Sequence, residues 1–379
     1  PAQVALALVL TLGAGLMLRS FQELRGVNPG FRAEGVLALR VMPPSAEYSE
    51  PERLRGFWDD ALSRVAALPG VSAVGAIHLL PLGGSNWGSP LTAQGREGLP
   101  EVDWRVVTPG YFGAAGVPLV RGRAFTEADR EGAAPVAVVN QTLARRLFPG
   151  EDPVGKQVST VFEGEGSWVT IVGVVGDTRD QSLATPARPQ LYRPFAQRST
   201  GSMTMLVRTR QDPAGLSRAV HEAVWSLDRN VPISDVRPLG RVVSESLSQP
   251  RVLVLLLGGF GVLALVLGAI GIYGVVSYGV AQRSREFGVR MALGARAGDV
   301  LRLVLGGAFR LAAAGVLAGV AASLVLARLL ASQLYGVRPT DPATFLGVAA
   351  LLAAVALVAS WLPARRATRV DPMVALRAD

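Results

Sequence analysis

The chain contains 379 residues, of which 50% are hydrophobic and 43 are glycine, and its formal net charge is +9. The absence of cysteine excludes disulfides and cysteine-based zinc sites, and two histidines far apart in sequence argue against a histidine-rich metal centre. The positive charge does not indicate nucleic-acid binding, because the arginines gather at the ends of apolar spans, where they set orientation in a membrane.

Four apolar spans divide the chain, one before and three after a long polar insert. A hydrocarbon core of about 30 Å needs about 20 apolar residues in a helix. The last three spans come close to or exceed that length without an acidic residue, and a buried soluble helix cannot account for all of them. We therefore predict an α-helical membrane protein with four transmembrane helices, at Val4 to Leu18, Val252 to Val280, Leu303 to Leu330 and Phe345 to Leu362.

The first span begins without a methionine or a basic leader. A cleaved signal peptide is the alternative, but Arg19, Ser20 and Phe21 do not resemble a cleavage site of small residues. We predict a retained transmembrane helix in residues 1–27, shortened at its N-terminus, so that the sequence resembles one part of a longer protein.

The polar insert, residues 28–249, has the pattern of a folded α+β domain. Its first β-α-β unit covers Gly35 to Met42, the amphipathic helix Pro51 to Leu68, and Val71 to Leu80. Its second unit covers Met203 to Thr209, the helix Pro213 to Leu227, and Pro232 to Val236. Two such units separated by other material predict a split β-α-β arrangement of the ferredoxin-like kind. Between them, two β-branched runs at Val136 to Val139 and Val169 to Val175, and a helix at Thr142 to Phe148, predict a second subdomain.

Few segments of the insert suggest chemistry. Residues 150–157 nearly spell a phosphate-binding loop, but Gln157 replaces the Mg²⁺-binding hydroxyl and Pro153 removes a backbone N–H. We interpret this segment as a turn between a helix and a strand. The acidic pairs Asp59 with Asp60 and Glu101 with Asp103 are interpreted as solvated faces or strand edges, not as catalytic carboxylates.

The distribution of arginine predicts the orientation. Residues 282–302 contain five arginines against two acidic residues, and four arginines follow the last span, whereas the loop from Ala331 to Thr344 has only Arg338, offset by Asp341. Short cytoplasmic loops are enriched in arginine, so we expect residues 282–302 and the C-terminus in the cytoplasm and the insert outside. Arg19, Arg25 and Arg251 fall on the outer side and weaken this bias.

The second span is unusually long. As a helix, Val252 to Val280 extends about 43 Å, about 13 Å more than the hydrocarbon core, so it either tilts or projects from the membrane. It leads into a short basic amphipathic segment that ends near Gly294. Such a segment lies on anionic lipid or docks in a partner's groove, and the residues alone favour neither.

Several motifs resemble those of one family. The segment from Arg283 to Arg296 (RSREFGVRMALGAR) and the tail from Pro363 to Arg377 (PARRATRVDPMVALR) resemble the coupling segment and closing motif of the MacB/FtsX family of ABC-transporter permeases. Motifs in the insert resemble that family's periplasmic core domain; they are Tyr111-Phe112, Gly116-Val117-Pro118, Gly122-Arg123, Asn140 to Arg145, Phe148 to Lys156, Val172 to Asp177 and Tyr192 to Pro194.

The resemblance implies the domains and partners. Residues 28–249 would be a MacB-like periplasmic core domain and residues 250–379 an FtsX-like permease domain, in a bacterial inner membrane. A separate cytoplasmic ABC ATPase would bind ATP and Mg²⁺, so that this chain holds no cofactor and is not itself an enzyme. A second permease module, either a homodimer partner or a sister half of a duplicated chain, and a periplasmic adaptor are further expected partners.

The resemblance also implies a mechanism. The ATPase would grip a coupling segment and its closure would move the external domain, in mechanotransmission that exports antimicrobial, peptide or lipoprotein-like substrates. The expected coupling residues are Arg283, Arg285, Glu286, Gly288, Arg290, Leu293, Gly294, Ala295 and Arg296. The alternative is a membrane-tethered scaffold or sensor that regulates a cell-wall hydrolase. A catalytic external domain is the weakest hypothesis, because no nucleophile, base and orienting group are found together in the sequence.

Overall fold

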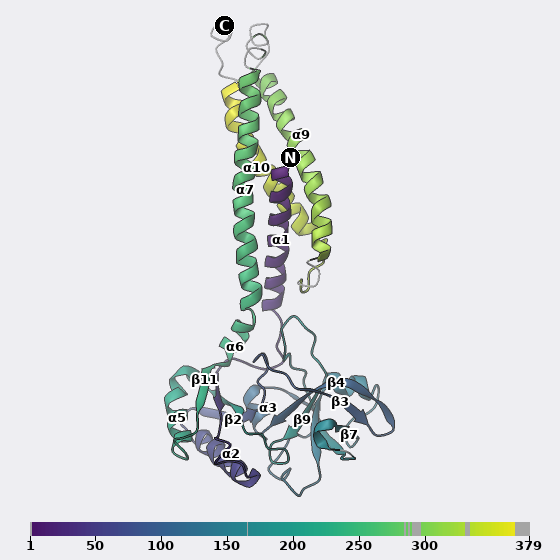
Figure 1. The fold of residues 1–379 in the computed structure, drawn as a ribbon, viewed down its shortest axis with the longest axis vertical. Helices are drawn as coiled ribbons and strands as arrows, with labels where there is room; N and C mark the ends of the chain where they lie inside the picture. The colour runs from purple at the N-terminus through teal and green to yellow at the C-terminus, as the bar shows by residue number, and fades with distance from the viewer. Residues whose placement is uncertain are drawn as a thin grey trace. The chain divides into compact units, whose positions relative to one another are not determined.

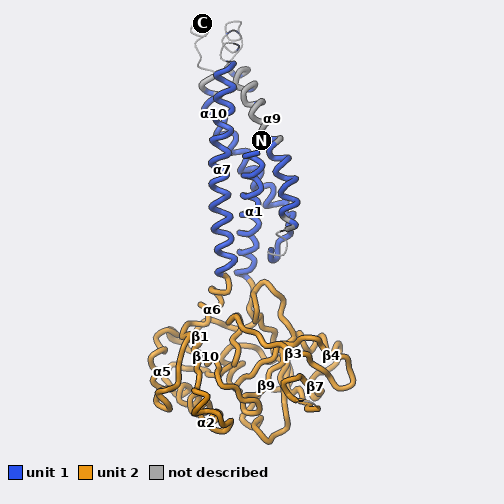
Figure 2. The backbone as a smooth tube through the Cα atoms, viewed as in Figure 1, with its two compact units in different colours: residues 1–26, 248–379 blue, residues 27–247 orange. Residues whose placement is uncertain are grey.

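The computed structural model describes residues 2–164, 166–283, 286, 289, 297–329 and 334–367. The chain divides into two compact units (Figure 2): unit 1 comprises residues 1–26 and 248–379, and unit 2 comprises residues 27–247. The sequence placed the limits of the insert at residues 28 and 249. The two units are described separately below.

Unit 1 is built from helices that lie side by side (Figure 1): α1 (Ala2–Arg25), α7 (Ser248–Gln282), α9 (Ala297–Leu329) and α10 (Pro342–Ala367). Within the described residues, α1, α7 and the part of α10 up to Pro363 are long and apolar enough to cross a membrane. Helix α9 contributes a shorter apolar stretch, Gly315–Leu326. Within the described residues, which leave out Leu330 of the third span, each of the four predicted spans lies in a helix, and α1, α7 and α10 meet the length expected of a membrane span.

Helix α1 packs against the other three helices of unit 1 and makes its most extensive contacts with α7 and α9. Leu8, Leu12 and Leu16 are almost fully buried there. The approach of α9 is close enough that a Cβ on Gly319 would lie 3.1 Å from the Ala5 backbone and 3.0 Å from Leu8. Small residues at such crossings allow helices to pack closely in lipid, which explains part of the glycine content.

Polar contacts connect the C-terminal end of α1 to the segment before α10. Arg19 forms an ion pair with Asp341, and the Ser20 hydroxyl accepts a 2.7 Å hydrogen bond from the Tyr335 N–H. Asp341 also accepts hydrogen bonds from the N–H and hydroxyl of Thr344, at 2.9 and 2.7 Å, and so caps α10. Arg19, one of the three arginines that weaken the predicted orientation, is therefore held by an ion pair.

Unit 2 begins and ends with the predicted β-α-β units. The first comprises β1 (Val36–Val41), α2 (Pro51–Ala66) and β2 (Val71–Ile77). The second comprises β10 (Met203–Thr209), the 3₁₀ turn η2 (Pro213–Leu216), α5 (Ser217–Trp225) and β11 (Ile233–Pro238). The strands pair in the order β11-β1-β10-β2, all antiparallel, which is the order of a split β-α-β unit. The predicted single helix at 213–227 is instead a 3₁₀ turn followed by a shorter α-helix.

The middle of unit 2 contains a ring of six strands. These are β3 (Gly88–Ala93), β4 (Arg96–Val107), β6 (Val136–Asn140), β7 (Gln157–Thr160), β8 (Val169–Val175) and β9 (Gln190–Pro194). Pairing runs β4-β3-β7-β8-β6-β9 and closes because β9 also pairs with β4. The edge strand β5 (Leu119–Gly122) pairs with β8. Three helices and a 3₁₀ turn complete the unit: α3 (Tyr111–Ala115), α4 (Gln141–Leu147), η1 (Val161–Glu163) and α6 (Leu239–Ser246).

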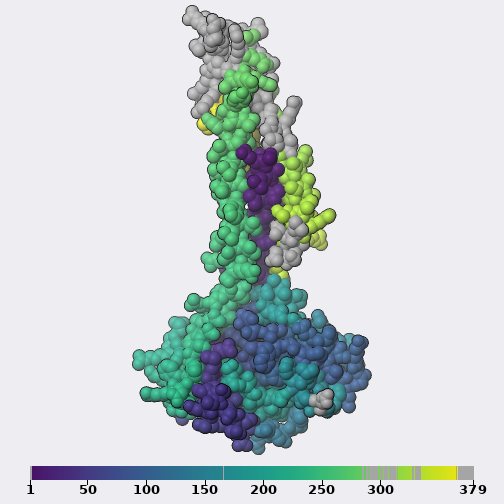
Figure 3. All heavy atoms as spheres, viewed as in Figure 1, coloured from purple at the N-terminus to yellow at the C-terminus, as the bar shows by residue number. Residues whose placement is uncertain are grey.

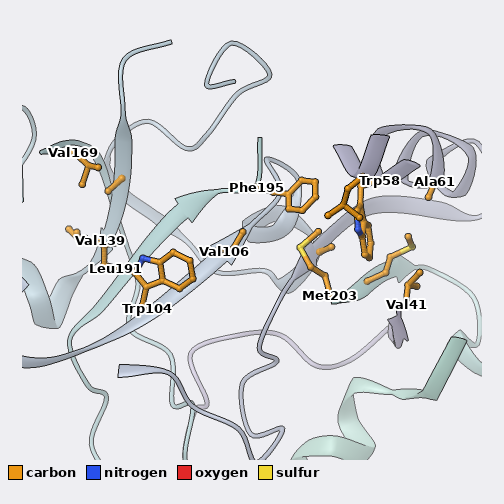
Figure 4. Close-up of a cluster of buried hydrophobic side chains, with 14 of the residues drawn as sticks. Val41, Trp58, Ala61, Trp104, Val106, Val139, Val169, Leu191, Phe195 and Met203 are labelled. Carbon is orange, nitrogen blue, oxygen red and sulfur yellow. The ribbon is translucent and has the colours of Figure 1, made fainter. Parts of the chain in front are cut away.

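One hydrophobic core runs through unit 2. Figure 4 shows Trp58, Phe195 and Met203 grouped on one side and Trp104 with its neighbours on the other, all within a single cluster. Strand β4 belongs to the six-strand ring and pairs with β2 of the first sheet as well. The middle segment thus forms a second substructure, the six-strand ring, but a shared strand pairing and a shared core join it to the first sheet in one body.

Candidate functional site

The predicted coupling segment lies just beyond the end of α7. Arg283 is an exposed turn residue directly after the helix, and Glu286 is exposed and helical. The other seven predicted coupling residues lie outside the described residues: Arg285, Gly288, Arg290, Leu293, Gly294, Ala295 and Arg296. Their role stays a prediction.

Helix α7, which leads to this segment, is a continuous helix of 35 residues. That is about 52 Å at 1.5 Å per residue, well beyond the hydrocarbon thickness of a membrane. Its buried residues form one narrow stripe of Gly261, Ala264, Gly268, Val276 and Val280. The excess length predicted from the sequence is confirmed.

The rest of α7 presents large apolar side chains outward. Leu256, Phe260, Leu263, Leu267 and Ile270 are each more than half exposed. Figure 3 shows α7 as a long green column of visible side chains. A surface of this kind is stable only against lipid or against other apolar helices, which agrees with a membrane location.

The loop that resembles a phosphate-binding loop is a turn, as predicted. The N–H groups of Val154, Gly155 and Lys156 donate to Asp152, Ile171 and Pro153, at 3.0, 2.8 and 3.1 Å. A phosphate-binding loop leaves such N–H groups free for its ligand. The Lys156 ammonium lies 3.2 Å from Glu151. These N–H groups and the ammonium therefore already have partners within the protein.

The insert motifs mostly mark turns and caps. Asn140 caps α4 by accepting the Leu143 N–H at 2.9 Å, and its oxygen also accepts the Gln190 N–H at 2.9 Å. Asp177 accepts the N–H and hydroxyl of Thr142, at 2.7 and 2.9 Å. Gly122 has a φ of +70°, and a Cβ there would lie 2.3 Å from the Val172 carbonyl oxygen. These motif positions are therefore occupied by residues that the local backbone requires.

Sequence reasoning missed a buried charged cluster on β4. The Arg105 side chain, 1% exposed, lies 2.8 Å from Asp180 and 3.7 Å from Asp103, and it donates to Asn86 at 2.5 Å. Asp103 is fully buried, so its interpretation as a solvated residue was wrong, whereas Glu101 is exposed as predicted. The reason is that this end of β4 is covered on both faces. The signal in the sequence was the i, i+2 spacing of Asp103 and Arg105, which places both on one side of a strand.

Burial dominates the titration behaviour of this region. His78 accepts the Val106 N–H at 2.9 Å, and burial together with the nearby Arg105 cation lowers the pKa of His78 to about 3. Burial raises the pKa of Asp103 despite its arginine neighbours. Among the described residues, no group of three or more histidine, aspartate and glutamate side chains could hold a metal ion. The cluster therefore has the character of a structural network.

Comparison with known proteins shows which family the chain belongs to. Residues 4–223 match the profile of the MacB-like periplasmic core domain, and residues 258–372 match that of the FtsX-like permease C-terminal domain. The chain belongs to the MacB/FtsX family of ABC-transporter permeases. The MacB/FtsX architecture accounts for both units, since the matched domains and the apolar helices together make a membrane permease with an extracytoplasmic domain.

Similar proteins include ABC exporters that combine two functions. The macrolide export ATP-binding/permease protein MacB of Rhodospirillum rubrum is 30% identical over all of this chain and 54% of its own length. The pyoverdine export ATP-binding/permease protein PvdT of Pseudomonas aeruginosa is 28% identical over 68% of this chain and 40% of its own. The chain thus spans about half the length of these curated relatives, or less.

A solved structure also aligns with part of the chain. The crystal structure of the periplasmic region of MacB from Actinobacillus actinomycetemcomitans covers 57% of this chain and 93% of its own, at 17% identity and a TM-score of 0.38.

Proposed function

We propose that the chain is the permease part of an ABC exporter and that it transmits movement from the cytoplasm to its external domain. ATP hydrolysis takes place on an ATPase that lies outside these 379 residues and binds ATP and Mg²⁺, and this chain holds no cofactor. The names of the relatives, which join ATP binding to permease function, support such a partnership.

The single observation that carries the mechanism is the continuity of α7. A single residue, Leu247, separates the end of α6 from the start of α7, and α7 runs without interruption to Gln282, directly before Arg283. A continuous helix resists compression and bending more than a loop does, so a displacement applied near Arg283 is carried along α7 toward unit 2. The ATPase would apply that displacement through the segment from Arg283 to Arg296.

The proposal includes an orientation and partners. The basic segment 282–302 and the C-terminus face the cytoplasm of a bacterial cell, and residues 28–249 lie outside its inner membrane. A second permease module, as a homodimer partner or a sister half, would cover part of the exposed apolar surface of α7, and a periplasmic adaptor would bind unit 2. The exported substrates would be antimicrobial compounds, peptides or lipoprotein-like molecules.

The test uses the chain reconstituted in proteoliposomes with its ATPase. The double variant Glu286→Ala/Arg290→Ala should insert and fold normally, while the stimulation of ATPase activity by the permease falls about tenfold, because charged contacts across the interface are lost. The control is Arg218→Ala/Glu222→Ala, which removes an exposed pair of the same i, i+4 spacing on α5 and should change nothing. Normal stimulation in the first variant would remove the role assigned to the segment.

A further inference from the structure

Unit 2 contains a cleft that none of the roles above explains. Its volume is about 760 Å³, and its walls come from the segment after α1, the start of α4 and the loop after β8. Four arginines line it, Arg32, Arg145, Arg146 and Arg179, and Asp177 is the one carboxylate among its lining residues. The lining therefore carries a net charge of about +3, a concentration of like charge that favours an anion in the cleft.

The one carboxylate does not neutralise the cleft, since it is already engaged. Asp177 accepts two hydrogen bonds from Thr142 at the start of α4, and it pairs with Arg145 at 2.8 Å. Arg179 donates to the carbonyl oxygens of Leu183 and Thr185, at 2.6 and 2.8 Å, and is held by these contacts. Arg32 and Arg146 line the cleft in addition to the pair of Arg145 and Asp177.

A fifth arginine adds to the positive charge nearby. Arg208 donates to the carbonyl oxygens of Ala114, Glu34 and Arg32, at 3.0, 3.2 and 2.8 Å. Its partial burial and the neighbouring Arg32 lower its pKa, while Glu34 opposes that effect. Three backbone carbonyl groups therefore hold Arg208 in place.

Two glycines allow the walls of the cleft to approach. Gly116 has a φ of +69°, and a Cβ there would lie 2.8 Å from Nε of Arg32. Gly30 has a φ of +86°, and a Cβ there would lie 1.9 Å from the Asp177 carbonyl oxygen. A side chain at Gly116 would displace Arg32, and one at Gly30 would displace the backbone of Asp177, so both glycines are needed for the close approach of these segments.

An apolar groove adjoins the cleft. Its volume is about 470 Å³, and it shares Gln141 and Arg145 with the cleft. Its other lining residues are mostly apolar and include Val120, Ala144, Phe148, Pro149, Pro153 and Val174. Along β5, Leu119 and Val120 are 46% and 50% exposed. A cationic cavity next to an apolar groove matches a molecule that is charged at one end and apolar at the other.

We propose that unit 2 binds an amphiphilic anion, with its phosphate or carboxylate group held by Arg32 and Arg146 and its apolar part in the groove beside α4. Guanidinium groups bind such oxyanions through paired hydrogen bonds, which a single lysine cannot provide. This site goes beyond the proposed function and does not depend on it, because binding is measured in the absence of ATP and of any ATPase.

The test titrates octyl phosphate into the full chain in phosphatidylcholine nanodiscs, followed by calorimetry. Octyl phosphate should bind at least tenfold more tightly than inorganic phosphate, because only the former can fill the groove. Equal affinities, or no binding at millimolar concentration, would overturn the proposal.

Variants locate the site. Arg32→Ala/Arg146→Ala should weaken octyl phosphate binding at least tenfold, whereas Arg32→Lys/Arg146→Lys should recover part of the affinity and Arg229→Ala, at an exposed arginine outside the cleft, should have no effect. Unfolding midpoints of all variants should match the wild type, since the changed side chains are exposed. Unaltered binding in the double alanine variant would overturn the assignment.

A competition experiment distinguishes a membrane lipid from a free amphiphile as the natural ligand. If phosphatidic acid in the nanodisc competes with octyl phosphate, the natural occupant is a membrane lipid. If it does not compete, the occupant is a free amphiphile. Either result supports an amphiphilic anion site, provided that the double alanine variant abolishes the effect.

Discussion

The two units differ in the interactions that stabilise them. Unit 2 buries large side chains, including Trp58, Tyr111 and Tyr192, in a core that covers both faces of its central strands. Unit 1 has a core of smaller residues, such as Ala7 and Leu8, and leaves most of α7 uncovered. Folding in water is driven by removal of apolar surface, but helices in lipid gain little from it and depend on close packing. Substitutions should therefore affect the two units differently.

The largest effect is expected at the core of unit 2. Trp58 is fully buried, so Trp58→Ala should destabilise the unit by about 3–5 kcal/mol. Urea unfolding of the full chain in detergent, followed by tryptophan fluorescence, measures the change. Trp87→Ala is the matched control, because Trp87 is 49% exposed and should cost much less. Equal losses in the two variants would show that unit 2 is not stabilised by its core.

A smaller, pH-dependent effect is expected from His78. The pKa of His78 is about 3 in the folded state and 6.5 in the unfolded chain. Between these pH values the unfolded state binds a proton that the folded state does not bind. Unit 2 should lose about 1.4 kcal/mol per pH unit as the pH falls from 6.5 toward 3. Urea unfolding at pH 7, 6 and 5 should show a smaller loss between pH 7 and 6 than between pH 6 and 5, where the slope approaches its full value.

The variant His78→Gln separates this effect from others. It should abolish the slope between pH 6.5 and 5, since glutamine can still accept the Val106 N–H but does not titrate. Asp103 acts in the opposite direction, because burial raises its pKa and its protonation favours the folded state. An unchanged loss of stability in the variant would assign the slope to another group.

In unit 1 the sensitive position is a glycine rather than a large side chain. Gly319→Ala places a Cβ against the backbone of α1 and should cost about 1–3 kcal/mol by overpacking. Gly306→Ala, also in α9 but with open space around it, should leave stability unchanged or slightly improved. Thermal unfolding in detergent compares them, and similar midpoints would mean that α1 and α9 do not pack closely.

Elements with their own apolar periodicity could be predicted from the sequence, whereas long-range strand pairing could not. The outer β-α-β units were predicted well, with β10 found at the predicted residues Met203 to Thr209, because each element has its own apolar periodicity. Strand β4 was missed, since its sequence is charged and contains Pro100, and its pairing with β9 joins residues far apart in the chain. Local pattern carries no information about that closure of the ring.

The candidate sites show the same limit. Motif resemblance predicted the coupling residues, of which the structure describes Arg283 and Glu286. The arginine cleft was not predicted, because Arg32, Arg146 and Arg179 come from three separate segments and only the fold brings them together. The buried cluster around Arg105 was missed for the same reason, as Asp180 lies on a distant loop.

The central claim is that α7 connects a cytoplasmic coupling segment to an external domain, and labelling of single cysteines tests it most directly. These 379 residues contain no cysteine, so Arg229→Cys in unit 2 and Arg283→Cys at the end of α7 each introduce one reporter. In intact spheroplasts, a membrane-impermeant maleimide should label the Arg229→Cys variant at once and the Arg283→Cys variant only after permeabilisation. Labelling of the Arg283→Cys variant alone in intact spheroplasts would contradict the account.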